Sequence, residues 1–398
     1  MKSKSNLNIA LLTDGITPFV TGGMQRHSAN LAKYFTLHGV QVTLVHCVLD
    51  GQIKPSDNQI NQELFGEQSE IKLHKIVTLN FPKAGKVPGH YVRNSYQYSK
   101  ELFNQVDFSE IDFVYAKGYS GWYYMEQKQK GLLLPPIGVK FHGYEMYQEL
   151  PNFTQKLKAK LLRKATKWNN EHADYIFSYG GKITELILDR FNVDASKVLD
   201  FTSGLDVDWL RKDKLQPSGS RVRFVFIGRA EVRKGIVELS KAIKTLIAKY
   251  DFDFHFIGPI PDAMKVGHNH VNYHGELNSK EAICQVLDQM DVLVCPSHAE
   301  GMPNVILEGM ARGLAILATD VGAVEKIVSP SNGILIQALD QEKLTAAIIE
   351  FMEMDSSEIF KKRNNSLEKI IQTYLWDKII VQIIQAVKSQ ESNCKIIE

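Results

Sequence analysis

Continuous apolar runs alternate with helix-type patterns from the start of the chain. The run 7–13 ends at a turn, a glycine-containing loop reaches Gly23, and apolar residues recur at helical spacing from 27 to 38. A second apolar run, 40–45, follows. Strand, loop, helix and strand in this order predict a right-handed βαβ unit. Because the runs do not alternate with polar residues, we expect a parallel sheet that is covered on both faces.

A second alternating series begins after the polar stretch 212–220, which contains proline and small residues and is typical of an interdomain linker. We expect strands at 222–227, 252–257, 271–274, 292–295, 315–318 and 334–336, and helices at 235–250, 280–290, 304–312, 341–353, 358–374 and 377–387. Two such series predict an α/β protein with two doubly wound, Rossmann-like parallel-sheet domains. The first domain would run to about residue 210 and the second would start at about 221.

The composition limits the possible function classes. The 398 residues are 44% hydrophobic and 23% charged, with a formal net charge of +2. These fractions are those of ordinary globular proteins, so they exclude a disordered or collagen-like chain. The balanced charge gives no reason to expect a nucleic-acid partner.

The cysteine and hydropathy patterns indicate a cellular compartment. The four cysteines are far apart and form no Cys-x-x-Cys pair, so reduced thiols fit better than disulfides or a zinc site. The apolar run 9–12 is shorter than the roughly 7–15 residues of a signal-peptide core. No apolar run reaches the roughly 18–20 residues of a membrane span. We therefore expect a cytoplasmic protein.

The strongest candidate chemistry lies in a loop that follows a strand, where doubly wound sheets bind their ligands. Glu300 and Glu308 are separated by seven residues that include a Gly-Met-Pro turn. Glu300 precedes a predicted helix, and Glu308 lies about one turn inside it. Free amides near Asn304 and Val305 would form an anion site at the start of this helix. The segment therefore offers amides to a phosphate and carboxylates to hydroxyl groups.

Three further segments carry weaker signals. Arg229 and Lys234 follow a predicted strand and suit a diphosphate, although a solvated basic loop is the alternative. Gly22 and Gly23 would let a ligand approach the backbone, but such a pair is also ordinary turn chemistry. His142 follows a strand-like run and could donate a hydrogen bond to a sugar hydroxyl, whereas a structural histidine is the commoner case. The first loop lacks Gly-x-Gly-x-x-Gly, which disfavours a nicotinamide oxidoreductase.

Together these segments resemble the retaining glycosyltransferases of the GT-B fold, specifically glycosyltransferase family 4. The resemblance covers nearly the whole chain in the family's order. It rests on Thr21-Gly-Gly-Met-Gln-Arg-His27, His142-Gly143, Ala173–Ser178, Ser203-Gly-Leu-Asp206, Gly228-Arg229, Lys234-Gly235, Glu300 with Glu308, Thr319–Glu325 and Asn332-Gly333. Two positions depart from the family, since Gln25 stands where glutamate is frequent and Ser203 where asparagine is usual. We expect altered acceptor or hinge contacts from them rather than inactivity.

The resemblance implies that two domains face a cleft and bind different substrates. Residues 1–210 would bind the acceptor, and residues 221–375 would bind a nucleotide-sugar donor. A final helix, about 376–398, would return to the first domain. Closure of the domains would assemble the site.

Carried over residue by residue, the resemblance gives each candidate a role. Arg229 and Lys234 would clamp the diphosphate of a UDP-, GDP- or ADP-sugar, assisted by the helix amides of Asn304 and Val305. Glu308 would accept hydrogen bonds from the ribose hydroxyls. The donor sugar would be contacted by Glu300 and His142, and the diphosphate would be approached from across the cleft by Gly22 and Gly23.

The implied reaction is transfer of a sugar with retention of its anomeric configuration. We hypothesise a same-face attack in which the leaving phosphate accepts the proton of the acceptor. Cationic groups that strengthen their hold as the phosphate gains charge would lower the barrier. The acceptor would be a glycan or a lipid-linked molecule in cell-surface polysaccharide or glycoconjugate synthesis. A noncatalytic sugar-binding or assembly protein, a phosphorylase and a nucleotide-sugar epimerase remain alternatives.

We expect no metal or other cofactor, because basic groups and helix amides would already neutralise the diphosphate. Two Asp-x-Asp pairs, Asp206 with Asp208 and Asp251 with Asp253, match the pattern of metal-dependent GT-A enzymes and are interpreted as coincidences. The basic helical stretch 156–167 leaves two interpretations open, a peripheral contact with anionic lipid or a core-packed helix with a solvated basic face. The upstream basic and aromatic positions considered with it are Lys83, Lys86, His90, Arg93, Tyr91, Tyr96 and Tyr98.

Overall fold

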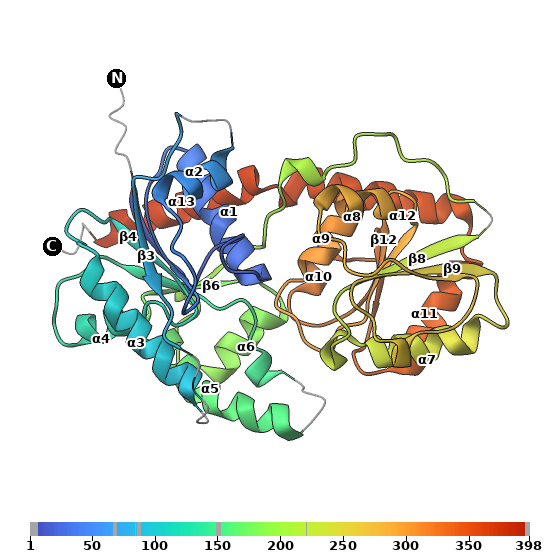
Figure 1. The fold of residues 1–398 in the computed structure, drawn as a ribbon, viewed down its shortest axis with the longest axis horizontal. Helices are drawn as coiled ribbons and strands as arrows, with labels where there is room; N and C mark the ends of the chain where they lie inside the picture. Colours follow the sequence, from blue (N-terminus) through green and yellow to red (C-terminus); the bar gives the residue numbers. More distant parts are fainter. Residues whose placement is uncertain are drawn as a thin grey trace.

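The computed structural model describes residues 7–66, 70–83, 85, 89–148, 153–219 and 221–394. The chain forms two α/β lobes, each built on one parallel sheet, which lie side by side (Figure 1). The predicted pair of doubly wound, parallel-sheet domains is confirmed. Lys86 and residues 395–398, which entered the sequence analysis, lie outside the described residues.

The first lobe holds a seven-stranded parallel sheet in the order β3-β2-β1-β4-β5-β6-β7. Its strands are β1 (Asn8–Leu12), β2 (Gln41–Val48), β3 (Lys75–Asn80), β4 (Phe113–Lys117), β5 (Ile137–Lys140), β6 (Tyr175–Ser178) and β7 (Val198–Asp200). Its helices are α1 (Gly23–Leu37), α2 (Asp57–Phe65), α3 (His90–Gln105), α4 (Trp122–Gln129), α5 (Phe153–His172) and α6 (Lys182–Arg190). Ile9 of β1 pairs with Val42 on one side and with Phe113 on the other. The strand order therefore reverses between β1 and β4, which is where such sheets open a ligand crevice.

The second lobe repeats this topology with six parallel strands in the order β10-β9-β8-β11-β12-β13. The strands are β8 (Val222–Ile227), β9 (Phe252–Ile257), β10 (Val271–Tyr273), β11 (Val292–Cys295), β12 (Ala315–Thr319) and β13 (Gly333–Ile336). The helices are α7 (Ile236–Leu246), α8 (Lys280–Leu287), α9 (Asn304–Ala311), α10 (Val324–Ile327), α11 (Gln341–Glu353) and α12 (Ser356–Lys369). Its strand order reverses between β8 and β11. The crevice of this sheet is therefore bounded by the loops that carry the predicted basic and acidic residues.

The last helix returns to the first lobe. After α12 and the single π-helical turn Ile370–Tyr374, α13 (Trp376–Cys394) runs along the first lobe (Figure 1). Trp376 and Ile380 are buried in the same hydrophobic cluster as Leu11 of β1. At the crossover, a Cβ on Gly204 would lie 2.6 Å from the Trp376 ring, so only glycine fits there. The final helix thus ties the two lobes together by packing on the first.

Helix boundaries differ from the sequence-based expectation at the two loops that matter most. Helix α1 begins at Gly23 rather than near His27, because its first turn lacks the apolar periodicity that reveals a helix. Helix α7 begins at Ile236 and ends at Leu246, shorter than the predicted 235–250. A separate 3-10 turn, Val232–Lys234, precedes it.

The basic stretch in the first lobe is helical, as predicted, and belongs to α5. Ala159 and Ala165 are buried, whereas Leu161 is 47% exposed. Tyr98 of α3 is not a surface residue, since it is buried and donates a hydrogen bond to the carbonyl oxygen of Thr13 at 2.6 Å. Within the ranges described above, no helix combines the length and hydropathy needed to cross a membrane.

Candidate active site

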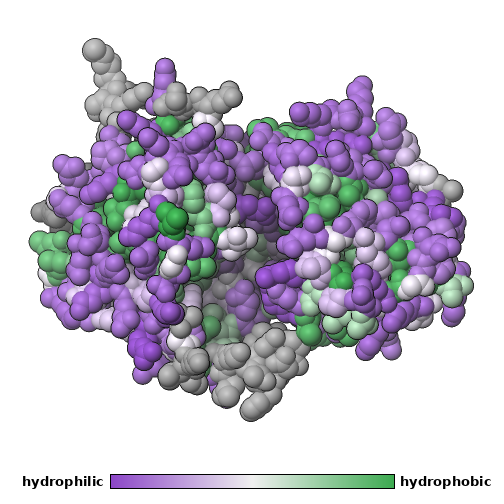
Figure 2. Space-filling model, in the orientation of Figure 1, coloured by the Kyte–Doolittle hydropathy of each residue, from purple (hydrophilic) through white to green (hydrophobic). Residues whose placement is uncertain are grey.

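The crevices of the two sheets face each other across the boundary between the lobes. Arg26 of α1 donates to Glu308 of α9 at 2.6 Å, and Lys182 of α6 pairs with Asp320, which follows β12, at 2.7 Å. Figure 2 shows a hollow between the two lobes. Residues far apart in the sequence therefore line one interdomain crevice.

The loop after β8 delivers cationic side chains to this crevice. Lys234 Nζ donates to Glu300 Oε1 at 2.5 Å, and Arg233 Nη1 lies 3.9 Å from the same oxygen. Arg229 pairs with Glu231 at 2.9 Å and is 73% exposed. Lys234 thus lies at the centre of the site, whereas Arg229 lies at its solvent-exposed edge. Sequence reasoning passed over Arg233, although its place next to Lys234 in a basic loop was a signal for it.

A glycine fixes how closely the loops after β8 and β11 approach. Gly235 has φ 70°, and a Cβ there would lie 2.0 Å from the carbonyl oxygen of Pro296. Any side chain would push apart the loops that carry Lys234 and Glu300. The contact between Lys234 and Glu300 therefore depends on glycine at position 235, because a residue with a side chain would not fit there.

The paired glutamates occupy the predicted positions around the start of α9. Glu300 lies in the loop after β11, and Glu308 lies one turn inside the helix, where it is buried and paired with Arg26. Asn304 and Val305 form the first turn of this helix, and Ser203 donates to the Asn304 side chain at 3.3 Å. The helix terminus and both carboxylates belong to one wall of the crevice.

His142 lies directly opposite the Glu300 loop. A Cβ on Gly301 would lie only 1.7 Å from the carbonyl oxygen of His142, so the two backbones touch across the boundary. The imidazole Nδ1 is 3.3 Å from Lys117 Nζ and 3.1 Å from the Tyr179 hydroxyl. Both of these groups can donate to Nδ1, and we assign the proton of the neutral ring to Nε2 on that basis. His142 therefore presents a neutral N–H donor.

Electrostatics hold His142 neutral. Burial lowers its pKa well below the ordinary histidine value, and the cations Lys117 and Lys140 lower it further. A hydrogen bond with the Gly23 backbone acts in the opposite direction. The ring is therefore neutral, and its hydrogen bond with the Gly23 backbone joins it to the start of α1.

The two lysines behind His142 were missed by sequence reasoning. Lys117 and Lys140 are the last residues of β4 and β5, and both are buried. Burial lowers the pKa of Lys140 to about 7, and its ammonium lies 3.7 Å above the Tyr179 ring. Burial also lowers the pKa of Lys117, with repulsion from Lys140 as the next cause. The sequence did contain a signal for them, because each lysine ends a buried parallel strand and so lies at the edge of the sheet where ligands bind.

The glycine pair lies at the start of α1. Gly22 caps the helix in an extended conformation, with φ 160°, and Gly23 is its first residue. A Cβ on Gly23 would meet no atom within 4 Å, whereas one on Gly22 would meet the side chain of Gln25 at 2.2 Å. The space beside Gly23 is therefore open to a ligand, and Gln25, where the family often has glutamate, lies against Gly22.

Both Asp-x-Asp pairs take part in contacts within the protein. Asp206 accepts a hydrogen bond from Tyr34 at 2.8 Å. Arg221 pairs with Asp251 at 2.7 Å and with Asp253 at 3.6 Å. These interactions give both pairs a structural explanation.

Comparison with known proteins gives the same picture as the geometry. Residues 21–209 match the model of glycosyltransferase family 4, and residues 221–354 match that of glycosyl transferases group 1. The chain is 31% identical over 127 residues to the putative teichuronic acid biosynthesis glycosyltransferase TuaC of Bacillus subtilis. That match covers 32% of this chain and 32% of the length of TuaC. This chain is also 26% identical over 329 residues to an uncharacterized glycosyltransferase of Methanocaldococcus jannaschii, and that match covers 80% of this chain and 85% of that protein.

Solved structures agree with the fold. Sucrose-phosphate synthase of Thermosynechococcus elongatus superimposes with a TM-score of 0.75 at 16% identity, covering 97% of this chain and 100% of that one. HepE of Anabaena, in complex with UDP and glucose, superimposes with a TM-score of 0.66 at 16% identity, covering 96% and 100%. The two family models together match most of the chain, and the two sheets have the expected topology. This chain therefore belongs to the family 4, group 1 glycosyltransferases and has their two-domain GT-B fold.

Proposed function

We propose that this protein is a retaining glycosyltransferase that moves a sugar from a nucleotide-sugar donor to a glycan or lipid-linked acceptor. The observation that carries the proposal is the contact of Lys234 with Glu300 at the start of α9, directly opposite His142. A cation, a helix terminus and a hydroxyl-binding carboxylate meet there. These three groups side by side suit a nucleoside diphosphate attached to a sugar.

The donor would bind by replacing contacts that the protein now makes with itself. Lys234 and Arg233 neutralise Glu300 in this state. A diphosphate would draw the two cations toward its oxygens and leave the Glu300 carboxylate for the hydroxyls of the sugar. Arg229, which is mostly exposed, has the freedom to turn onto the diphosphate. Glu308, buried on α9, would accept hydrogen bonds from the ribose.

Transfer would depend on charge that develops in the transition state. As the bond to the sugar breaks, negative charge grows on the leaving phosphate, and the cations and the first amides of α9 bind it more strongly. The acceptor hydroxyl would attack from the same face, and the leaving phosphate would take its proton. The neutral N–H of His142 would exchange its contact with the Gly23 backbone for a hydrogen bond to a sugar hydroxyl. The proposal includes no metal or other cofactor, because protein cations and amides supply the stabilisation.

The printed names of relatives suggest the biological setting. They include TuaC, named for teichuronic acid biosynthesis, and a capsular polysaccharide biosynthesis glycosyltransferase of Staphylococcus aureus. We propose a role in cell-surface polysaccharide or glycoconjugate synthesis on the cytoplasmic side of the membrane. The exposed Leu161 and the basic side chains of α5 support a peripheral contact with anionic lipid.

A thermal-shift screen tests the donor assignment. UDP-, GDP- and ADP-sugars are added in turn, and one class should raise the unfolding temperature because a ligand bound to the native state stabilises it. The stabilising donor is then incubated with candidate acceptors, and nucleoside diphosphate should be released only when an acceptor is present. Turnover without an acceptor would favour an epimerase, dependence on phosphate a phosphorylase, and binding without turnover a noncatalytic protein.

Charge removal tests the site. We expect Lys234→Met to weaken donor binding by about 10- to 100-fold, because a charge-assisted hydrogen bond contributes roughly 1.5–3 kcal/mol. The matched control is Lys244→Met, an exposed lysine on α7 of the same domain. Equal donor affinity for Lys234→Met and Lys244→Met would remove the proposed role of Lys234.

A further inference from the structure

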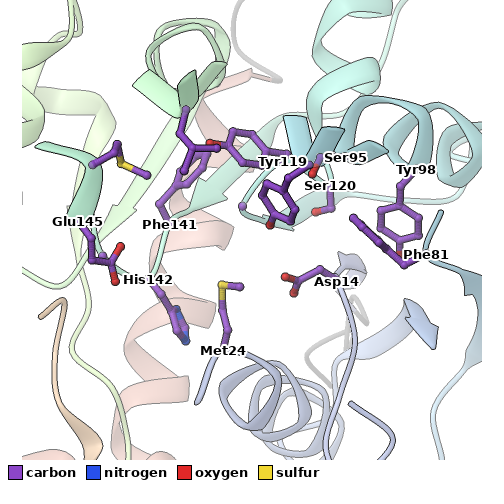
Figure 3. A pocket seen from close by; sticks show the side chains of 15 residues that line it. Asp14, Met24, Phe81, Ser95, Tyr98, Tyr119, Ser120, Phe141, His142 and Glu145 are labelled. Carbon is purple, nitrogen blue, oxygen red and sulfur yellow. The ribbon is translucent and has the colours of Figure 1, made fainter. Parts of the chain in front are cut away.

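The first lobe contains a second cavity next to the proposed donor site. It has a volume of about 210 Å³ and lies at the carboxyl end of the seven-stranded sheet (Figure 3). Asp14 comes from the loop after β1, and Gly118 and Ser120 come from the loop after β4. The cavity thus opens at the point where the strand order reverses, the usual ligand position in such sheets. His142 lines it, so it adjoins the place where transfer would occur.

One oxygen of the Asp14 carboxylate has no hydrogen-bond partner among the described residues. This oxygen, Oδ1, is buried. Figure 3 shows its carboxylate pointing into the middle of the cavity. A buried, unsatisfied carboxylate oxygen costs free energy unless a donor reaches it. A ligand hydroxyl is the simplest group that would satisfy it.

The cavity wall around Asp14 is largely aromatic. The rings are those of Phe81, Tyr91, Tyr98, Tyr119 and Phe141. Two of the hydroxyls are already engaged, since Tyr98 donates to the Thr13 carbonyl oxygen and Tyr119 pairs with Thr166 at 2.7 Å. These residues therefore offer apolar ring surface. A sugar ring, with apolar C–H faces and a polar rim, matches aromatic walls that surround a carboxylate.

The charge of the cavity opposes an anionic ligand. Two carboxylates, Asp14 and Glu145, line it, and the described lining contains no lysine or arginine. Lys117 lies behind the wall, where its ammonium contacts His27 at 3.1 Å and His142 at 3.3 Å. The cations that suit phosphate gather on the other side of the crevice, around Lys234. A phosphate or carboxylate group would meet repulsion in this cavity.

We propose that this cavity holds the reacting end of the acceptor, that this end is an uncharged sugar residue, and that Asp14 accepts a hydrogen bond from one of its hydroxyls. The inference rests on the proposed glycosyltransferase function and adds the chemical class of its acceptor. Tyr91 and Tyr119 would pack against the sugar ring. The sugar would thereby reach the side of the crevice opposite Glu300.

Direct binding of small glycosides tests this assignment without knowledge of the donor. The probes are the methyl glycosides of glucose, galactose, mannose and N-acetylglucosamine, and the counter-probes are glucose 6-phosphate and glycerol 3-phosphate. Binding is measured by saturation-transfer NMR titration. At least one neutral glycoside should bind the wild type, and both Asp14→Asn and Tyr91→Ala should weaken it by about tenfold or more.

A matched variant and a donor measurement separate the possible failures. Tyr96→Ala removes a tyrosine of the same helix that bonds Glu126 and does not line the cavity, so it should bind the glycoside as the wild type does. The thermal shift with the nucleoside diphosphate should be unchanged in all three variants. Preference for the phosphate-bearing probes, equal glycoside binding by Asp14→Asn, or no binding of any neutral glycoside would overturn the acceptor assignment. If nucleotide did not raise the unfolding temperature of the wild type, the donor assignment would instead be refuted.

Discussion

Replacing Asp14 by asparagine should stabilise the protein at neutral pH. Burial raises the pKa of Asp14 from 3.8 to about 6, and the nearby Lys117 only partly opposes this shift. The folded protein therefore holds the proton more tightly than the unfolded chain does. The ionised carboxylate is a cost to the native state, and asparagine removes the charge with little change in shape.

The sign and size of the effect follow from linkage. A raised carboxyl pKa means that the folded state binds more protons than the unfolded state between pH 3.8 and about 6, so stability falls as pH rises through this window. The difference between the two pKa values corresponds to about 3 kcal/mol at 1.36 kcal/mol per unit. Asp14→Asn and the wild type should be about equally stable near pH 4. The variant should be more stable by about 3 kcal/mol above pH 7.

Urea unfolding of both proteins at a series of pH values from 4 to 7.5 measures this difference. The titration of buried histidines and lysines that do not interact with Asp14 cancels in the subtraction. Lys117 is the exception, because the Asp14 charge raises its pKa. The control is Asp107→Asn, an exposed carboxylate whose pKa is lowered by hydrogen bonds from Ser109. Its stability difference should change with pH in the opposite direction. Parallel stability curves for the wild type and Asp14→Asn across the window would show that Asp14 is solvated, and the reasoning would fail.

Two further predictions concern the lobes and their boundary. Arg363→Met should destabilise the second lobe by about 1–3 kcal/mol, measured by urea unfolding, because it leaves buried hydrogen-bond acceptors unsatisfied. Arg363 is buried and donates to Asp291 at 3.0 Å and to the Gly313 carbonyl oxygen at 2.9 Å. The Asp291 charge stays compensated, since Arg223 also pairs with it at 3.0 Å. A loss below about 0.5 kcal/mol would contradict this prediction. Gly301→Ala should lose transfer activity, because its Cβ would collide with the His142 carbonyl oxygen and keep the lobes apart. The nucleotide-dependent thermal shift should remain, and solution scattering should give a larger radius of gyration. Wild-type activity of this variant would show that the lobes need not meet there.

Much of the donor side was predictable because its signals are local. The Glu300 to Glu308 segment combines a turn, a helix start and two carboxylates within nine residues, and the structure has the predicted helix at Asn304. Lys234 was likewise recognisable from a loop that follows an apolar strand. The end of α7 was not, because apolar spacing continues to Ile247 and Tyr250 although the helix ends at Leu246.

On the other side of the crevice the sequence indicated His142 and the glycine pair but not their contacts, because those contacts join residues that are distant in the sequence. Arg26 and Glu308 are 282 positions apart, and nothing in either local pattern indicates the other. Asp14 appeared in the sequence only as the residue that ends an apolar run. Its significance depends on rings supplied by α3 and by the loops after β3, β4 and β5.

The sequence by itself determined two parallel sheets, their order along the chain and the family motifs, because hydrophobic periodicity and turn residues act over a few neighbouring positions. The tertiary structure alone decided which charges are buried together, which carboxylate oxygen lacks a partner and which backbones touch across the lobes. Those properties depend on desolvation and on distances of a few ångströms between separate elements, and a linear pattern contains neither. The neutral state of His142, for example, follows only once Lys117 and Lys140 are buried behind it.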